Sequence, residues 1–258
     1  MSSCVAVPSR LLFFQNTEHH FSLIMLNVIF EDNHLLVLNK PTLIATMGAA
    51  PGEPSFLEQA RAYIKKKYNK QGNVYLGVVS RLDAHVSGVI MFARTSKCAS
   101  RVSEQLRKKT VEKIYRAIVP AGILPTTGTL ENWVVKDDAS RRVRCVTGPD
   151  VTFAGEHGKI EHPKNARLSF SVIATDAKRD VDLVEVKLET GRKHQIRVQL
   201  SHAGCPIVGD VKYDSQSPFP SGIALHCCRL QLLHPTLKTP LVFEVPPPKF
   251  WKMANFDV

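Results

Sequence analysis

Residues 79–93, VSRLDAHVSGVIMFA, join a polar segment to a short apolar run. Val89–Ala93 is uncharged and starts with β-branched residues, so it predicts a buried strand rather than a helix. The polar residues before it then lie on a connection. Gly88 permits a backbone bend that a residue with a Cβ atom resists, and Ser87 can bond the local backbone. We therefore expect a shaped loop that presents Asp83, whereas a lone Asp in a turn is usually only a solvated turn residue.

Composition predicts a globular protein with an anionic partner. The chain has 258 residues, enough to bury a full core, and 44% of them are hydrophobic. Lys and Arg number 34 against 23 acidic residues, and the resulting formal charge of +11 is a common footprint of a polyanion-binding surface. The basic residues cluster in four runs, Lys65–Lys67, Arg107–Lys109, Arg141–Arg144 and Arg192–Lys193. One run is explained by a solvated face, but four favour nucleic acid. An anionic membrane is the weaker alternative, because no basic amphipathic helix of the membrane-binding type is present.

Cysteine usage and hydropathy indicate a cytoplasmic protein. The six cysteines show no C-x-x-C pair, and the adjacent Cys227 and Cys228 do not bridge each other comfortably, so reduced thiols are expected. No apolar run approaches the roughly eighteen residues that a membrane span requires. Polar residues separate the short apolar runs Leu11–Phe14 and Leu23–Leu26, which argues against a secretory signal.

We expect residues 1–25 to be an extension and residues 26–258 to be one domain. The first 25 residues show no sustained period, and a strand signal begins directly after Met25. Two interpretations stay open: a disordered or loosely docked tail, or a segment that is not translated because Met25 is the true start. No internal repeat or linker divides the chain after residue 26.

Strand signals dominate the rest of the chain. The pattern SFLE, residues 55–58, is a capping box that opens a helix to about residue 69, with Tyr68 on its apolar face and Gly72 as its end. Two more helices are predicted at residues 95–108 and 194–203, the second with first-turn amides exposed for an anion. Residues 147–166 are predicted to be a surface excursion. Strands are predicted at residues 28–31, 35–39, 89–93, 111–119, 130–135, 143–146, 168–174, 183–188, 224–233 and 241–245. These signals indicate an α+β domain around a mixed sheet.

Three pieces of the sequence invite a joint interpretation: SRLDAHVSG at residues 80–88, KIYRA at residues 113–117 and ETGRKHQIRVQL at residues 189–200. In this order and spacing they resemble the RluA-type pseudouridine synthase family. The third piece is the most specific, and it is followed by HAGCPIVGD at residues 202–210 and by Tyr213. With ALH at residues 224–226 and the His234-Pro235 pair, the resemblance covers residues 26 to about 250.

The resemblance implies the pseudouridine synthase fold, a mixed and largely antiparallel sheet with flanking helices and a central active-site cleft. It also implies an isomerase that turns uridine in RNA into pseudouridine. Asp83 is then the essential catalytic carboxylate, Tyr115 the ring stacked on the target uracil, and Arg197 the ionic partner of Asp83.

Three further basic residues are candidates for RNA binding. Arg81 resembles the family's Arg before Leu-Asp, and it either fills the space left by the flipped base or holds phosphate. Its alternative is a salt bridge within the loop. Arg192 and Lys193, near a helix start, are candidates for phosphate contacts, and a solvated helix end is their alternative.

The expected chemistry suits these residue types. It breaks the N1–C1′ bond, rotates the uracil and rejoins it through C5, with no redox change or net hydrolysis, so neither a cofactor nor a metal is expected. Burial alone raises the pKa of a carboxyl group, and a guanidinium 4 Å away opposes that shift with roughly 4 kcal/mol of attraction at an effective dielectric near 20. An aromatic ring stacked on a base contributes about 1 to 3 kcal/mol.

The expected partner is structured RNA, a stem-loop of ribosomal or transfer RNA, bound by a monomer without the S4 RNA-binding domain of many relatives. Three positions depart from the family pattern: Ser80 and Gln199 stand where His is common, and Val86 stands where Thr is usual. None of the three is the acid, the aromatic residue or the paired base. We therefore expect activity to survive and loop geometry or RNA preference to change.

Other functions have less support. The main alternative is a noncatalytic RNA-binding module that keeps the fold. A metal site would use His194, His202, His226 and His234, but no H-x-x-x-H pair with a carboxylate ligand stands out. A glycosidase needs two carboxylates that flank a bond, and only Asp83 has a supporting context.

Overall fold

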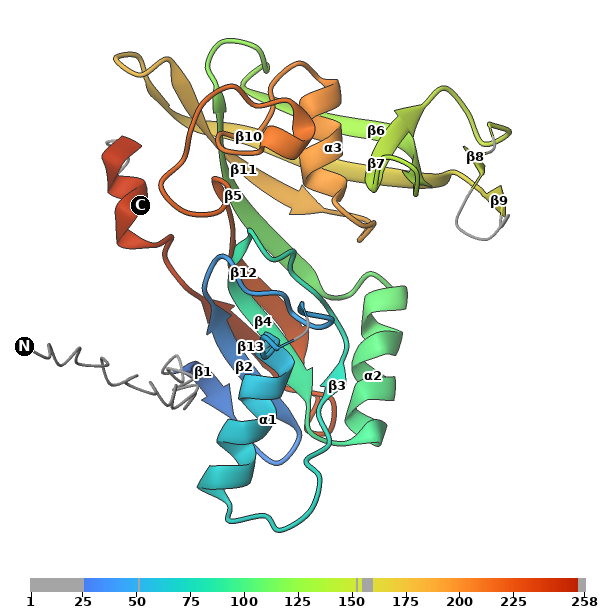
Figure 1. Cartoon of the computed structure of the whole chain (residues 1–258), viewed down its shortest axis with the longest axis vertical. Coiled ribbons are helices and arrows are strands. Elements are labelled where there is room, and N and C mark those ends of the chain that lie inside the picture. Colours follow the sequence, from blue (N-terminus) through green and yellow to red (C-terminus); the bar gives the residue numbers. More distant parts are fainter. Residues whose placement is uncertain (1–25, 51, 152, 155–159, 255–258) are drawn as a thin grey trace, which may run out of the picture.

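The computed structural model describes residues 26–50, 52–151, 153–154 and 160–254, and the predicted extension at residues 1–25 lies outside this part of the chain. An eleven-stranded sheet forms the body of the described protein (Figure 1). Its strands are β1 (Asn27–Glu31), β2 (Leu35–Lys40), β3 (Gly77–Val78), β4 (Ser87–Ala93), β5 (Glu112–Pro120), β6 (Thr127–Asp137), β7 (Arg142–Val146), β10 (Lys164–Asp176), β11 (Val181–Leu188), β12 (Leu225–Leu233) and β13 (Pro240–Glu244). The short strands β8 (Phe153–Ala154) and β9 (Ile160–Glu161) pair with each other. The helices are α1 (Phe56–Lys67), α2 (Ser96–Arg107), α3 (Gln195–His202) and the 3₁₀ helices η2 (Val211–Tyr213) and η3 (Lys249–Ala254).

The sheet is mixed and largely antiparallel, which confirms the predicted fold class. Its order is β1-β2-β4-β12-β5-β11-β10-β6-β7, with β3 beside β4 and β13 beside β12. Every pair is antiparallel except β4 with β12, which run parallel where Ser87 and Gly88 face His226 and Cys227. This parallel pair places the loop that precedes β4 at the middle of the sheet.

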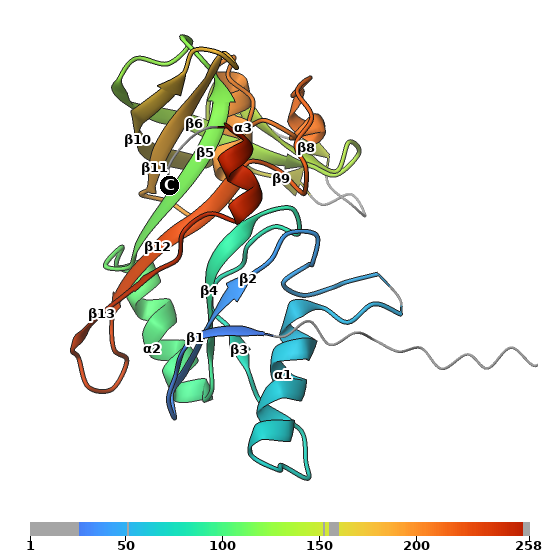
Figure 2. The ribbon, with the colours of Figure 1, turned by 90° about the vertical axis from the view of Figure 1, so that its left-hand side faces the viewer.

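Helices cover both faces of the sheet near β2 and β4. In β2, Leu36 and Leu38 pack into the same core as α1, whereas Leu35 and Val37 pack on the opposite face with α2. Figure 2 shows α1 and α2 on opposite sides of this part of the sheet. Because successive side chains of a strand point to opposite faces, burial on both sides accounts for the unbroken apolar run of β2. None of the described helices is long and apolar enough to cross a membrane.

The predicted capping box opens α1, but the end of the helix differs from the prediction. The Glu58 amide donates to Ser55 Oγ at 3.3 Å, and the Ser55 amide donates to Glu58 Oε2 at 2.7 Å. The helix ends at its cap Tyr68 rather than at Gly72, because Asn69 already adopts a left-handed backbone with φ of 48°. The prediction that Tyr68 lies on the apolar face of the helix is wrong. Tyr68 is the residue at which the helix ends, and it is 46% exposed.

Two predictions in the second half of the chain also need correction. The surface excursion expected at residues 147–166 ends early, because β10 begins at Lys164, which pairs with Val134 of β6. The exposed amides expected at the start of α3 are absent. Gln195 and Ile196 are buried, and the Gln195 amide donates to the Arg192 carbonyl at 3.2 Å. The Arg192 carbonyl therefore takes the place of an anion at the first amide of α3.

Candidate active site

The loop between β3 and β4 presents Asp83 and is fixed through its backbone. Thr46 Oγ1 accepts from the Leu82 amide at 3.2 Å and donates to the Leu82 carbonyl at 2.7 Å. The buried Lys40 ammonium donates to the Ala84 carbonyl at 3.3 Å. Burial lowers the pKa of Lys40 to about 7, although the nearby Asp83 carboxylate opposes the shift. The backbone on both sides of Asp83 is therefore held in place.

Gly88 and Ser87 anchor the end of this loop to β12. Gly88 has φ of +118°, and a Cβ atom there would collide with the backbone of Cys227, so only glycine fits the parallel pairing. This confirms the predicted role of Gly88. The Ser87 hydroxyl bonds Nδ1 of His226 at 2.8 Å, rather than the local backbone as expected. The loop geometry thus depends on a strand far along the chain.

Arg197 of α3 joins two carboxylates. Its Nε and Nη2 donate to Asp210 at 2.6 and 2.7 Å, and its Nη1 donates to Asp83 Oδ2 at 3.0 Å. The Arg197 and Asp210 side chains are 4% and 1% exposed, whereas Asp83 is 29% exposed. Burial lowers the pKa of Arg197, but the two carboxylates outweigh burial and raise it. Asp210 thus fixes the guanidinium, and Asp83 is the partly exposed carboxylate that lines the pocket.

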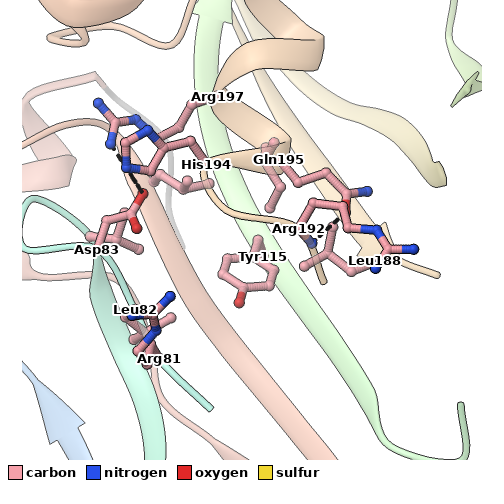
Figure 3. Close-up of a pocket in the computed structure, with 12 residues that line it drawn as sticks. Arg81, Leu82, Asp83, Tyr115, Leu188, Arg192, His194, Gln195 and Arg197 are labelled. Carbon is pink, nitrogen blue, oxygen red and sulfur yellow. Dashed lines mark hydrogen bonds and ion pairs between the residues drawn. The ribbon is translucent and has the colours of Figure 1, made fainter. Parts of the chain in front are cut away.

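Tyr115 of β5 lies across the pocket from this ion pair (Figure 3). Its side chain is only 6% exposed, and it lines the same pocket as Asp83 and Arg197. Burial, assisted by Cys227 and Asp83, raises the pKa of Tyr115 well above its ordinary value. The ring is therefore a neutral phenol at physiological pH and offers an apolar face to the pocket.

The structure brings together five of the six predicted site residues. Arg81 and Arg192 line the pocket with Asp83, Tyr115 and Arg197. Figure 3 shows Arg81 below Asp83 and Arg192 on the far side of Tyr115. Lys193 is not among the residues that line this pocket.

Lys193 instead lines a neighbouring hollow. Lys164 and Arg192 line that hollow too, so Arg192 belongs to both depressions. Arg192 also donates from Nε to the Asn165 carbonyl at 2.9 Å, which fixes part of its side chain. A basic surface thus continues outward from the pocket.

The sequence matches the family described as RNA pseudouridylate synthase over residues 34–202. The chain belongs to this family. The RNA pseudouridine synthase YhcT of Bacillus subtilis, whose name calls it uncharacterized, is 35% identical over 224 residues that cover 86% of this chain and 69% of the relative. The ribosomal large subunit pseudouridine synthase D of Xanthomonas campestris is 31% identical over 241 residues, covering 88% and 67%. The predicted RluA-type membership and isomerase class are confirmed.

Solved structures show the same fold as this pseudouridine synthase. The human RNA pseudouridylate synthase domain containing 4 superposes with a TM-score of 0.70 at 23% identity, covering 88% of this chain and 91% of the human one. The human RNA pseudouridylate synthase domain containing 1 gives 0.65 at 22% identity, covering 88% and 85%. The pseudouridine synthase fold predicted from the motifs is therefore confirmed.

Two of the three departures from the family pattern, Val86 and Gln199, lie in the synthase site or beneath it. Val86 is buried and lines the pocket. Gln199, 1% exposed, donates from Nε2 to the Leu130 and Ala166 carbonyls, each at 3.1 Å, so it ties α3 to β6 and β10. Val86 can thus alter the pocket surface, whereas Gln199 acts in the support of α3.

Residues that sequence reasoning missed complete the site of the synthase. His194 lies 3.7 Å from Asp83, measured from Nε2 to Oδ2, and Tyr213 bonds His194. Asp210 and Tyr213 belong to the stretch that carries the family resemblance, but no role had been attached to them. A carboxylate that follows the apolar run PIVG, residues 206–209, is the signal that could have revealed Asp210 as a buried ion-pair partner.

Two histidines considered as metal ligands have other partners in the synthase. His226 bonds Ser87 through Nδ1 and donates from Nε2 to the Val245 carbonyl 3.1 Å away, and His234 Nε2 lies 2.7 Å from Asp32 Oδ2. Within the described ranges, no three His, Cys, Asp or Glu side chains gather as metal ligands do. Both histidines connect segments that are far apart in the sequence.

Proposed function

We propose that this synthase isomerises particular uridines of ribosomal or transfer RNA and that Asp83 is its essential carboxylate. The observation that carries the proposal is the 3.0 Å ion pair between Arg197 Nη1 and Asp83 Oδ2, at a pocket that Tyr115 also lines. The name of the Xanthomonas relative refers to the ribosomal large subunit, which supports ribosomal RNA as one target class. All the residues required come from one chain, so we propose that a monomer suffices.

The reaction conserves all atoms of the nucleotide. The N1–C1′ bond breaks, the C5–C1′ bond forms, the proton leaves C5, and N1 takes up a proton. An ionised Asp83 can attack the sugar, attack the base or remove a sugar proton, and each route requires the negative charge that Arg197 stabilises. The partial exposure of Asp83 gives substrate access, while the buried Arg197–Asp210 pair stays fixed.

Tyr115 is proposed to stack on the target uracil. A stacked ring retains the base while it is detached from the sugar, at a gain of about 1 to 3 kcal/mol. Its raised pKa disfavours the phenolate that would act as the base at C5. If Tyr115 nevertheless helped proton loss from C5, Tyr115→Phe would slow the rearrangement step itself, whereas a stacking role leaves that step unchanged.

Arg81, Arg192 and Lys193 are proposed to hold the RNA around the flipped base. All three side chains are exposed, and Arg81 and Arg192 stand on opposite sides of the pocket (Figure 3). The target uridine must leave its stack to reach Asp83, and cations near the opening can hold the flanking phosphates. Target selection then depends on this basic surface.

Release of tritium from RNA transcripts that contain 5-tritiated uridine tests the proposal. We expect release with the wild-type protein and none with Asp83→Asn. Asp214→Asn is the matched control, because it makes the same change in an exposed side chain next to η2 and should leave the release unchanged. RNA binding without tritium release by the wild type would instead indicate a noncatalytic RNA-binding module.

The target is found by mapping pseudouridines in the RNA of cells that lack the gene. A site in ribosomal or transfer RNA that is lost in those cells, and restored by the wild-type gene but not by the Asp83→Asn gene, supports the proposal. A complete and unchanged set of pseudouridines in both RNA classes contradicts the proposed targets.

A further inference from the structure

His194 stands beside Asp83 and lines the same pocket. Its Nε2 lies 3.7 Å from Asp83 Oδ2, and its Nδ1 lies 2.7 Å from the hydroxyl of Tyr213. The backbone at His194 is left-handed, with φ of 52°, an uncommon conformation for a residue other than glycine. Backbone strain of this kind persists where the surrounding contacts require a defined side-chain position. The two ring nitrogens thus have different partners and different chemical roles.

The Tyr213 hydroxyl determines which nitrogen carries the proton. Tyr213 is 3% exposed, and its oxygen accepts a hydrogen bond from the Val143 amide at 3.1 Å. The hydroxyl proton then has the Nδ1 lone pair as its acceptor. The opposite arrangement, with a proton on Nδ1, leaves a buried O–H without an acceptor and turns a ring lone pair toward the Asp83 carboxylate. Because both consequences are unfavourable, the hydrogen-bond network selects the tautomer with its proton on Nε2.

We propose that His194 is a positioning residue that directs a neutral N–H at Asp83, in a tautomer set by the Val143–Tyr213–His194 chain. This inference rests on the proposed role of Asp83. The distance of 3.7 Å is longer than a hydrogen bond, so the contact closes when the substrate fills the pocket. A neutral donor orients the carboxylate and stabilises its charge, while Arg197 supplies a full positive charge in direct contact with it.

Charged groups around His194 favour its neutral form. Asp83 faces it from the loop before β4, Arg197 from α3, Lys193 from the segment before α3, and Lys212 from η2. Burial lowers the pKa of His194, Asp83 opposes this shift, and the three cations reinforce it, to about 4. His194 therefore stays neutral from pH 5 upward, and a proton on Nε2 is present throughout the physiological range.

Single-turnover rates at saturating RNA provide the first test. Loss of a hydrogen bond to a charged group slows a reaction by about tenfold to a hundredfold. We therefore expect the single-turnover rate of His194→Leu to be lower than the wild-type rate by that factor. His194→Gln should keep much of the rate, because its side-chain amide offers a neutral N–H. Tyr213→Phe, which keeps the ring under Arg197 but loses the hydroxyl, should be slowed by about threefold to tenfold. RNA affinity should stay the same in all three variants.

A matched control separates this effect from the loss of any bonded hydroxyl. Tyr63→Phe removes a hydroxyl that donates to Glu31 at 2.9 Å, and because neither residue lines the pocket its rate should equal the wild-type rate. Wild-type rates in His194→Leu at saturating RNA overturn the proposal. If His194→Leu does not fold, the Gln and Phe variants still decide it: a Gln variant as slow as Asp83→Asn, or a Tyr213→Phe variant as fast as the wild type, contradicts it.

Nitrogen-15 NMR of the labelled wild-type protein tests the tautomer directly. His194→Gln identifies the signal by its disappearance. We expect an unprotonated Nδ1 and a protonated Nε2 from pH 6 to 8, and a mixture of tautomers in Tyr213→Phe. A protonated Nδ1 or an imidazolium at pH 7 overturns the proposal. A merely structural role for His194 would not require either tautomer.

The two proposals fail in different ways. Activity in Asp83→Asn refutes the proposed function whatever the tautomer of His194. An inactive Asp83→Asn together with a fully active His194→Leu refutes only the role of His194. The pH dependence of the rate gives a further test. If the wild-type rate titrates with an ordinary histidine pKa and the His194→Gln rate does not, His194 acts as a cation, which contradicts the neutral donor.

Discussion

Helices α1 and α3 begin in opposite ways. α1 follows Ser55 in an extended conformation, with φ of −64° and ψ of 164°, and its capping box satisfies the first amides. α3 follows His194 in a left-handed conformation, with φ of 52° and ψ of 21°, and no side chain caps it. Local sequence preference thus favours the start of α1 and opposes the start of α3.

The two helices also bury different side chains. α1 buries mainly apolar side chains such as Phe56 and Ile64, whereas α3 buries the polar Arg197 and Gln199 beside apolar neighbours. Buried polar groups are stable only when their partners are in place, and those of α3 come from distant loops and strands. The comparison teaches that α1 is held by apolar packing, whereas α3 combines apolar packing with buried polar contacts that belong to the site.

The largest expected effect is the loss of the buried ion pair of α3. Arg197→Met leaves Asp210 as an uncompensated buried carboxylate, which should lower the free energy of unfolding by about 3 to 5 kcal/mol. Lys67→Met removes a half-exposed ammonium from Glu31 and should cost far less, because the Glu31 carboxylate keeps Arg94, Tyr63 and Tyr68 as partners. Urea unfolding at pH 7 measures both variants, and equal losses would remove the distinction between the helices.

A smaller effect should appear as acid sensitivity of α3. The unfolded chain protonates the histidine below about pH 6.5, while the folded His194 stays neutral to about pH 4. The unfolded state therefore binds more protons in this window, and stability falls as the pH drops through it. Between pH 7 and 5 the expected contribution is about 2 kcal/mol, and His194→Gln should remove it. Burial also lowers the pKa of His226 to about 4, so part of the loss of stability between pH 7 and 5 should remain in His194→Gln.

Glu31, which contacts α1, should respond in a different range. Burial raises the pKa of this carboxyl group, but hydrogen bonds from Lys67, Tyr68 and Tyr63 outweigh burial and lower it. Its contribution is therefore complete above about pH 4.5 and is lost only below that value. Unfolding curves at pH 7 and 5 should show the same difference in Glu31→Gln as in the wild type. A reduced difference would contradict the assignment of acid sensitivity to α3.

The smallest expected effect concerns the cap of α1. Ser55→Ala should lower the free energy of unfolding by about 1 kcal/mol and leave tritium release unchanged. Thermal unfolding and single-turnover rates, measured on the same preparation, check both halves of the prediction. A loss of activity without loss of stability would mean that α1 participates in the site.

The contrast between α1 and α3 also explains what sequence reasoning could predict. The capping box at Ser55 and the apolar run of β4 are local patterns, and the structure confirms both. The family motifs indicated Asp83, Tyr115 and Arg197 before any geometry was known, and the structure places them at one pocket.

What could not be predicted depends on contacts between distant segments. The left-handed backbone of His194 follows no local rule, and its bond to Tyr213 exists only once η2 and α3 are in position. The exposure of Tyr68 was missed for a related reason, because helical periodicity continues in the sequence beyond the point where the backbone leaves the helix.

The parallel pairing of β4 with β12 has a consequence for synthesis of the protein. Gly88 contacts Cys227, so the backbone that carries the acid reaches its final form only after most of the polypeptide has emerged from the ribosome. Contacts between such distant positions form late because a long loop must close first. A nascent chain that stops before residue 225 lacks the strand that fixes the loop of Asp83, so the cell would gain modifying activity only from molecules that contain β12.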